Sequence, residues 1–545
     1  FLQWLFGITN SVFLASNFID VAYFPFIRKR SSAEIFEQLS GQSDMAKLIP
    51  QFILDFWWVI LIFIFSVYVL LQLYKRPKIN FESNYTFNHP KQWLYVVLIF
   101  CISFGLAVLG ARGGLQRVPI DIVNAGSVAT PEEAPIVLNT PFTLLKSMSQ
   151  KAVEEHDFYT QEELNKIYNP IHHFKDSTFK KQNVVVLILE SFSKEYTKLG
   201  RIKSITPFLD SLMNKSLLFT NAFSDGTKSI EGIPAILSSL PSLMENPFIN
   251  SIYANNQQTS FATLLGKEGY ETAFFHGGIN GTMNFDSWAP LAGYKYYFGR
   301  NEYNNEKDFD GFWGILDEPF LQFAIKKMNE FKEPFHSSIF TLSSHHPYFI
   351  PEKYKNMFPK TDLENSESIG YADYSLRQFF SVAQKTSWYK NTFFVITADH
   401  ASLSNHPFFA NQVGNLTIPI MFFKPDNSLS NVNPKVFCQI DILPSVMSLL
   451  GYNKPFFAFG QNYNSTKPHN CYYYANGTYF LYTDSMVYRY IGSNYNSKYN
   501  YLRDSSLNNG IPDSYPKLDS IMLSRHHAFL QKYSQTLIHN EGFVK

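Results

Sequence analysis

Few cysteines occur in the 545 residues of this chain: Cys101, Cys438 and Cys471 are all it has. Their spacing does not match that of cysteine metal ligands, and three thiols can form at most one disulfide. Disulfide cross-links are therefore excluded as a main source of stability.

The chain also lacks a block of basic residues, and its formal net charge is only +1. Binding to nucleic acid requires clustered Lys and Arg to neutralise phosphates, so we exclude a nucleic-acid partner. What the chain has in excess is aromatic residues, which make up 17% of it. Many of them lie near the N-terminus.

Three apolar stretches near the N-terminus predict membrane spans. Residues 56–74 and 92–111 contain no charged residue, and each is about long enough to cross a hydrocarbon layer of ~30 Å as a helix. Residues 1–19 are also uncharged, and the chain opens inside them without a methionine, a charged leader or a cleavage site. We therefore expect no signal peptide but a truncated N-terminus, with about three spans within residues 1–112.

Charge in the connections between these stretches indicates orientation. Residues 75–91 carry four basic residues against one glutamate, which favours a cytoplasmic loop. The chain after Arg112 would then lie outside the membrane. This predicts a multi-pass membrane protein whose main domain is extracytoplasmic.

The remaining chain divides into three predicted regions. Residues 113–182 read as a helical tether, with a capping-box start at Thr160. Residues 183–460 alternate apolar strands with amphipathic helices, as in βαβ units. Residues 461–545 form a small C-terminal extension, with a hairpin turning at Asn476-Gly477 and a closing helix.

Four predicted strands end in polar residues that carry chemistry. Residues 183–189 run into Glu190, residues 272–275 into His276, residues 338–342 towards His345, and residues 391–397 towards Asp399-His400. Short, all-apolar runs are typical of parallel strands buried on both faces. Because such strands place ligands at their carboxyl ends, these side chains should share one rim of an α/β, mainly parallel sheet.

Thr227 lies in residues 223–232, between the first predicted strand and an apolar helix. It would sit at or just before a helix N-terminus, where exposed amides stabilise an anion. The alternative is a plain helix cap, for which threonine is common.

Glu190, Thr227, Asp399 and His400 together form a set of three oxygen ligands and one nitrogen ligand. Mn²⁺, Zn²⁺ and Mg²⁺ all suit such a set. Coordination would lower the pKa of the Thr227 hydroxyl enough for it to attack phosphorus. A structural Asp399-His400 pair is the alternative.

Five segments of the chain resemble the lipoteichoic acid synthase family: residues 187–192 (LILESF), 206–210 (TPFLD), 343–348 (SSHHPY), 397–400 (TADH) and 439–445 (QIDILPS). This family consists of membrane-anchored phosphoglycerol transferases with a sulfatase-like fold of the alkaline phosphatase superfamily. The resemblance implies one divalent metal, with manganese expected, held by Glu190, Thr227, Asp399 and His400. It also implies Thr227 as nucleophile and His276 and His345 as substrate-binding residues.

The chain departs from this family after His276-Gly277. There the family carries an Asp, a Trp and an Arg that hold the glycerol phosphate, whereas this chain has Gly278, Met283 and Phe285. The loss of the Arg removes a bidentate phosphate clamp, so the head group is in question. Asn280, Asn284 or Asp286 are candidates for reading a different group.

The resulting prediction is a transferase that moves a phospholipid head group, phosphoglycerol first, to a hydroxyl of a glycan, glycolipid or polymer through a phospho-threonine. The alternatives are a phosphoethanolamine transferase, a phosphodiesterase or other sulfatase-like hydrolase, and a catalytically silent membrane protein. Formylglycine chemistry is disfavoured because residues 227–231 lack the C/S-x-P-x-R pattern.

Overall fold

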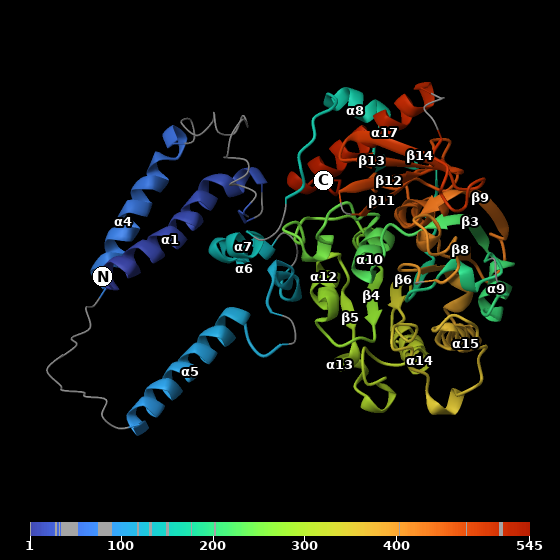
Figure 1. Ribbon diagram of the computed structural model, residues 1–545, viewed down its shortest axis with the longest axis horizontal. Coiled ribbons are helices and arrows are strands. Elements are labelled where there is room, and N and C mark those ends of the chain that lie inside the picture. Colours follow the sequence, from blue (N-terminus) through green and yellow to red (C-terminus); the bar gives the residue numbers. More distant parts are fainter. Residues whose placement is uncertain are drawn as a thin grey trace. The chain divides into compact units, whose positions relative to one another are not determined.

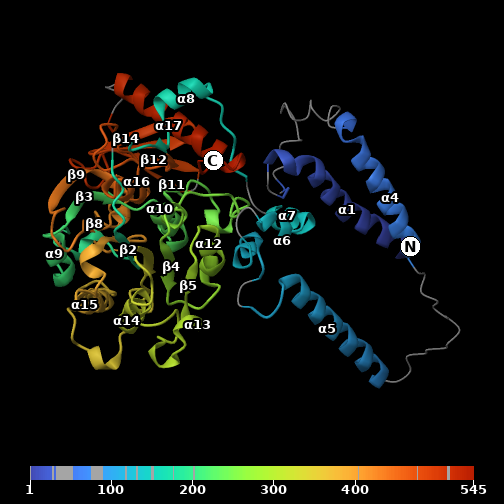
Figure 2. The ribbon, with the colours of Figure 1, turned by 180° about the vertical axis from the view of Figure 1, so that it is seen from behind.

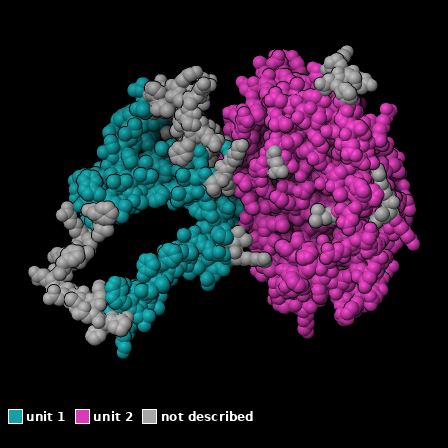
Figure 3. Space-filling view, in the orientation of Figure 1, with its two compact units in different colours: residues 1–152 teal, residues 153–545 magenta. Residues whose placement is uncertain are grey.

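The computed structural model describes residues 2–27, 30–31, 33, 53–74, 90–116, 119–129, 133–148, 152–175, 177–200, 203–402, 404–475, 477–511 and 516–544. It separates into two units, Phe1–Ala152 and Val153–Lys545, which Figure 3 colours differently. The region boundaries near residues 112, 182 and 460 stay predictions. The predicted cytoplasmic loop over residues 75–91 lies almost wholly outside the described residues.

The first unit contains the three predicted apolar helices, α1 (Leu2–Ile27), α4 (Trp57–Leu73) and α5 (Pro90–Arg112). Within the described part of the chain, one helical stretch, Lys91–Arg112, is long and apolar enough to cross a membrane. The prediction of about three spans is therefore not confirmed. The short helices η1 (Ile122–Ser127), α6 (Ala134–Val137) and α7 (Thr140–Ser147) follow.

Buried Asp20 joins α1 to α7 inside the first unit. Its carboxylate accepts a hydrogen bond of 2.5 Å from the Thr140 hydroxyl and one of 2.9 Å from the Ser31 amide, and it pairs with Arg30 at 3.3 Å. A buried charge needs such partners because it has lost its hydration.

The second unit is built on an eight-stranded sheet in the order β5-β4-β6-β2-β7-β8-β3-β9 (Figure 1). The strands on one side of the sheet are parallel to one another: β5 (Tyr296–Phe298), β4 (Glu271–His276), β6 (Phe335–Phe340), β2 (Asn183–Leu189) and β7 (Thr392–Ala398). On the other side, β8 (Ile420–Phe423) runs antiparallel to both its neighbours, whereas β3 (Leu217–Phe223) and β9 (Asn431–Cys438) are parallel. The predicted mainly parallel α/β sheet is confirmed.

Every residue of β2 and of β7 is buried, which indicates that both faces of the sheet are covered. Helix α15 (Ser366–Ala383) packs against α14 (Asp317–Met328) and α9 (Pro207–Met213), and α10 (Ser229–Ser238) packs against α16 (Ile442–Leu449). The remaining helices of this part are α11 (Phe261–Gly266), α12 (Phe285–Leu291) and α13 (Arg300–Tyr303). Before the sheet, α8 (Gln161–Ile167) begins with the capping box predicted at Thr160, and β1 (Ile171–His172) pairs with β10 (Phe456–Phe457).

The C-terminal extension is a four-stranded antiparallel sheet and a long helix. The strands are β11 (Cys471–Ala475), β12 (Thr478–Tyr482), β13 (Met486–Ile491) and β14 (Asn494–Asn500), and the helix is α17 (Pro516–Ile538). Figures 1 and 2 show α17 along this sheet, where Phe529 stacks on Tyr472 at 3.9 Å between ring centroids. The antiparallel pairing of β11 with β12 and the helix α17 agree with the predicted hairpin and closing helix, whereas Asn476 of the predicted turn lies outside the described residues.

One disulfide joins the eight-stranded sheet of this unit to its four-stranded sheet. Cys438, the last residue of β9, is bonded to Cys471, the first residue of β11. Cys101 is a free cysteine, exposed on α5. The single possible disulfide therefore connects the C-terminal extension directly to the edge strand of the main sheet.

Removal of this bond should loosen the extension. Cys438→Ser combined with Cys471→Ser should lower the free energy of unfolding by about 3 kcal/mol, because the cross-link closes a loop of 33 residues in the unfolded chain. Chemical denaturation of the double variant and of the oxidised wild type measures this difference. Cys101→Ser is the matched control and should leave the midpoint unchanged. Equal midpoints for the double variant and the control would contradict the expectation.

Candidate metal centre and active site

Glu190 follows β2 directly and is 1% exposed. Its side-chain oxygens accept hydrogen bonds from the Ser191 hydroxyl at 2.6 Å and the Ser229 hydroxyl at 3.3 Å. Burial raises the pKa of the Glu190 carboxyl well above its ordinary value, and the nearby charge of Asp399 raises it further. In the absence of a cation, this carboxyl group is thus in an unfavourable environment for its charged form.

Asp399 follows β7, which is the strand paired with β2. The register places Leu189 opposite Ala398, so that Glu190 and Asp399 emerge side by side. One oxygen of Asp399, Oδ1, accepts hydrogen bonds from the backbone amides of Ser191 at 2.8 Å and His400 at 2.7 Å. The other oxygen, Oδ2, is buried and has no hydrogen-bond partner among the described residues.

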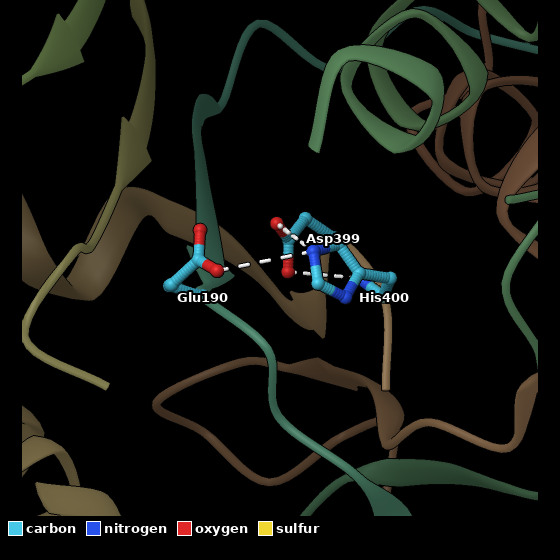
Figure 4. A group of neighbouring side chains, drawn as sticks. All are labelled: Glu190, Asp399 and His400. Carbon is cyan, nitrogen blue, oxygen red and sulfur yellow. Dashed lines mark hydrogen bonds and ion pairs between the residues drawn. The ribbon is translucent and has the colours of Figure 1, made fainter. Parts of the chain in front are cut away.

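His400 completes the group shown in Figure 4. Its Nδ1 lies 2.8 Å from the Ala401 carbonyl oxygen, to which it must donate, so that Nε2 keeps its lone pair. That Nε2 lies 3.3 Å from Asp399 Oδ2 and 3.8 Å from Glu190 Oε1. One ligand atom from each of the three residues lies within 4.8 Å of the others.

These residues fit a divalent cation. Two buried carboxylates repel each other, and Asp399 Oδ2 is an acceptor without a donor in the described structure. A cation bound between them and the Nε2 of His400 removes both problems, and oxygen ligands with one imidazole suit Mn²⁺, Zn²⁺ and Mg²⁺ alike. The predicted ligands Glu190, Asp399 and His400 are therefore brought together.

Thr227 lies just before helix α10, as predicted. The helix begins at Ser229, with Lys228 as its N-cap, and the Thr227 amide donates to Glu231 Oε2 at 2.9 Å. Two residues further on, the Ser229 hydroxyl contacts Glu190, so this loop leads directly to the carboxylate group. Burial raises the pKa of the Tyr473 phenol, and a hydrogen bond with the Thr227 side chain opposes this effect. The C-terminal extension thus contacts the proposed nucleophile.

His345 lies in a turn after β6 and is partly exposed. Its Nδ1 lies 2.8 Å from the His346 carbonyl oxygen and donates to it, which leaves Nε2 available. The Trp313 ring covers His345 at 4.1 Å between centroids, and the Trp313 indole donates to the same carbonyl at 2.7 Å. In this turn, the Ser344 hydroxyl donates to the backbone oxygen of Glu190 at 2.5 Å, so the turn adjoins the carboxylate group.

His276 has a different environment. It is buried, stacks on Phe340 at 5.2 Å and lies 3.3 Å from the Tyr297 hydroxyl through Nδ1. Burial lowers its pKa to about 3, so the ring is neutral at physiological pH. None of the contacts recorded among the described residues joins it to Glu190, Asp399 or His400. Its role in binding substrate stays a prediction.

Of the three residues proposed to replace the missing phosphate clamp, two are hydrogen-bonded elsewhere, whereas Oδ1 of Asp286 is buried without a hydrogen-bond partner among the described residues. Asn280 donates to Glu302 at 3.2 Å, and Asn284 donates to Asn250 at 2.9 Å. Burial raises the pKa of Asp286. The side chain that does lie beside His345 is Trp313, from the loop before α14. Sequence analysis did not identify Trp313 as a site residue. The glycines on either side of Phe312-Trp313 were the only sequence feature that marked this loop.

Comparison with known proteins places this arrangement in a family. Residues 182–452 match the model of the Sulfatase family. Among solved structures, the chain resembles a protein of the alkaline phosphatase superfamily from Vibrio parahaemolyticus, with a TM-score of 0.62, 23% identity and coverage of 78% of this chain and 96% of that one. These findings define a Sulfatase-family domain whose fold resembles that of the alkaline phosphatase superfamily protein.

The relatives found by sequence comparison carry a more specific name than the Sulfatase family. Lipoteichoic acid synthase 1 of Bacillus subtilis is 25% identical over 339 residues, which are 57% of this chain and 53% of the relative. The lipoteichoic acid synthase of Staphylococcus aureus strain USA300 is 25% identical over 347 residues, 59% of this chain and 53% of the relative. The crystal structure of the lipoteichoic acid synthase LtaP from Listeria monocytogenes matches with a TM-score of 0.57 and 21% identity, over 70% of this chain and 98% of that one.

The chain contains a Sulfatase-family domain over residues 182–452, and it is similar in sequence to proteins named lipoteichoic acid synthase. The match spans about half the length of these curated relatives, 53% for both named above.

Substitution of a proposed ligand should strongly weaken metal binding. Glu190→Gln keeps the shape of the side chain but removes its charge, and should weaken Mn²⁺ binding by more than the roughly 10–100-fold typical of residues that only support ligands. Isothermal titration calorimetry with the purified chain measures this affinity. Glu195→Gln, at a buried glutamate outside the group, is the control. Unchanged affinity in Glu190→Gln would show that the three side chains do not hold the ion.

Close packing of α10 against the Asp399 backbone should also matter. A Cβ added at Gly232 would lie 2.2 Å from the Asp399 carbonyl oxygen, so Gly232→Ala must displace the helix or the ligand. We expect a loss of about 1–3 kcal/mol in the free energy of unfolding and weaker Mn²⁺ binding. Gly266→Ala is the matched control, because its Cβ would meet nothing within 4 Å. Denaturant melts and calorimetry distinguish the two variants, and equal behaviour would contradict the expectation.

Proposed function

We propose that this protein is a metal-dependent transferase that moves a phospholipid head group to an acceptor hydroxyl. Phosphoglycerol is the first candidate for this head group. The observation that carries the proposal is the convergence of Glu190, Asp399 and His400 beside the Thr227 loop. The similarity to proteins named lipoteichoic acid synthase supports the choice of reaction. A glycan, glycolipid or polymer would supply the acceptor hydroxyl.

Four residues would hold the metal: Glu190, Asp399, His400 and Thr227. Manganese is the ion we propose, with zinc or magnesium as alternatives. A bound divalent cation lowers the pKa of a hydroxyl and neutralises charge on a phosphate. Ser191 and Ser229 orient Glu190, and the two backbone amides at Asp399 Oδ1 leave Oδ2 directed to the site.

In the proposed reaction, Thr227 Oγ attacks the phosphorus of the donor lipid and its proton leaves to a base. The bond from phosphorus to the diacylglycerol oxygen breaks, and that oxygen takes up a proton. The acceptor hydroxyl then attacks the phospho-threonine ester and restores the Thr227 hydroxyl. His345, whose Nε2 is available, is the candidate for proton transfer or phosphate contact in these steps.

Location follows from the same proposal. A donor lipid stays in the bilayer, and the apolar helix Lys91–Arg112 would keep the second unit close to it. We propose a multi-pass protein of the bacterial cell membrane with the catalytic domain outside. The disulfide Cys438–Cys471 supports this side of the membrane, because disulfides persist in oxidising compartments.

A labelling experiment tests the nucleophile and the donor together. Purified protein is incubated with labelled phosphatidylglycerol or phosphatidylethanolamine, and adducts are sought by mass spectrometry. We expect an adduct on Thr227 with phosphatidylglycerol, none in Thr227→Val, and turnover reduced by at least about 1,000-fold in that variant. Thr227→Ser, which keeps a hydroxyl, is the control that should retain labelling.

The same experiment separates the rival functions. Labelling by phosphatidylethanolamine alone would indicate a phosphoethanolamine transferase. Release of free head group without any acceptor would indicate a hydrolase. If neither lipid labels the wild type more than Thr227→Val, the transferase proposal is wrong.

A further inference from the structure

A polar cavity of about 430 Å³ lies at the junction of the main sheet and the C-terminal extension. It is lined by residues of β9, of the chain before β11, of the β12–β13 turn and of α17, among them Lys435, His469, Asn470, Asp484, Tyr488 and Arg525. Three strands separate β9 from β2 in the sheet order, so at about 4.8 Å per strand the cavity is roughly 19 Å from the Glu190 strand. It is thus distinct from the candidate metal centre.

Two cations line this cavity without a recorded acidic partner. Among the described residues, neither Lys435 on β9 nor Arg525 on α17 forms an ion pair, although Asp519 on the same helix is paired with Lys498. A smaller cavity of about 180 Å³ shares Pro468, Asn470 and Arg525 with the first. Arg525 therefore lines both cavities, and its guanidinium group suits bidentate binding of a phosphate or carboxylate.

Two buried polar atoms at the cavity also lack a hydrogen-bond partner within the described part of the chain: His469 Nε2 and Asn470 Oδ1. The opposite ring nitrogen of His469, Nδ1, contacts Asp441 Oδ2 at 3.2 Å, and Asp441 lines the smaller cavity. Burial lowers the pKa of His469, but the charge and hydrogen bond of Asp441 outweigh it and raise the pKa. Native structures rarely leave such groups unsatisfied without a ligand or water.

The remaining lining is suited to hydroxyl groups rather than to a bare anion. Asp484 is a hydrogen-bond acceptor, and one of its oxygens accepts a hydrogen bond from the Val436 amide at 2.6 Å. The buried Tyr488 forms an aromatic wall of the cavity. A carboxylate beside two cations would repel a simple anion, whereas it accepts hydrogen bonds from a polyol. We propose that this cavity is a second ligand site, specific for a sugar or polyol that carries an anionic group such as a phosphate.

Binding can be measured independently of catalysis. The full chain in detergent, with Thr227→Val and Glu190→Gln introduced to silence the candidate metal centre, is titrated calorimetrically with glucose 6-phosphate, glucose and inorganic phosphate. We expect glucose 6-phosphate to bind at least tenfold more tightly than either of the others. Because no activity is measured, failure of the transferase proposal would not affect the outcome.

Variants locate the binding. Arg525→Gln should weaken glucose 6-phosphate at least tenfold and Lys435→Ala several-fold, whereas Arg525→Lys should retain part of the binding. Lys332→Ala, at an exposed lysine after α14, is the control. Because Lys435 is exposed, its variant should fold normally even if Arg525→Gln does not. The proposal is overturned if Lys435→Ala binds like the control, or if inorganic phosphate binds as tightly as glucose 6-phosphate.

Discussion

Two carboxylates placed side by side in a buried rim are the constraint on which the second unit depends. Glu190 and Asp399 emerge there because β2 and β7 are parallel neighbours in exact register. Such a pair is unfavourable without positive charge, since burial and mutual repulsion both oppose ionisation. The surrounding hydroxyl and amide donors reduce this cost only in part, and they leave Asp399 Oδ2 unpaired within the described structure. A cation is the simplest group that would neutralise the two carboxylates and bind the unpaired oxygen of Asp399.

The elements around the rim are arranged to hold it rigid. Gly232 allows α10 to approach the Asp399 backbone, and the Gln439 amide donates to the carbonyl oxygens of Ala398 and Asp399 at 2.8 and 2.7 Å. Gln439 follows Cys438, whose disulfide anchors β11. The extension contributes Tyr473 beside Thr227. The C-terminal sheet is therefore connected, through a few residues, to both the proposed metal ligands and the proposed nucleophile.

The substrate side of the site differs from what the resemblance to the lipoteichoic acid synthases implies. After His276 the chain departs from the family pattern, and the structure shows different contacts in this part of the domain. Trp313 covers His345, and Asn280 and Asn284 are hydrogen-bonded to other residues. Different side chains around the same scaffold are how one fold acquires different substrates. The sugar-phosphate cavity on β9 would add a second point of contact for such an acceptor.

Periodicity and strand ends alone determined the α/β class, the hairpin, the closing helix and the meeting of Glu190, Asp399 and His400, because buried parallel strands must be apolar and must end together at one edge. Local sequence carries that information. Only the tertiary structure decided that His276 is enclosed by aromatic rings, that Trp313 reaches His345, and that Cys438 pairs with Cys471. These depend on contacts between residues 32 to 64 positions apart, which residue spacing does not predict.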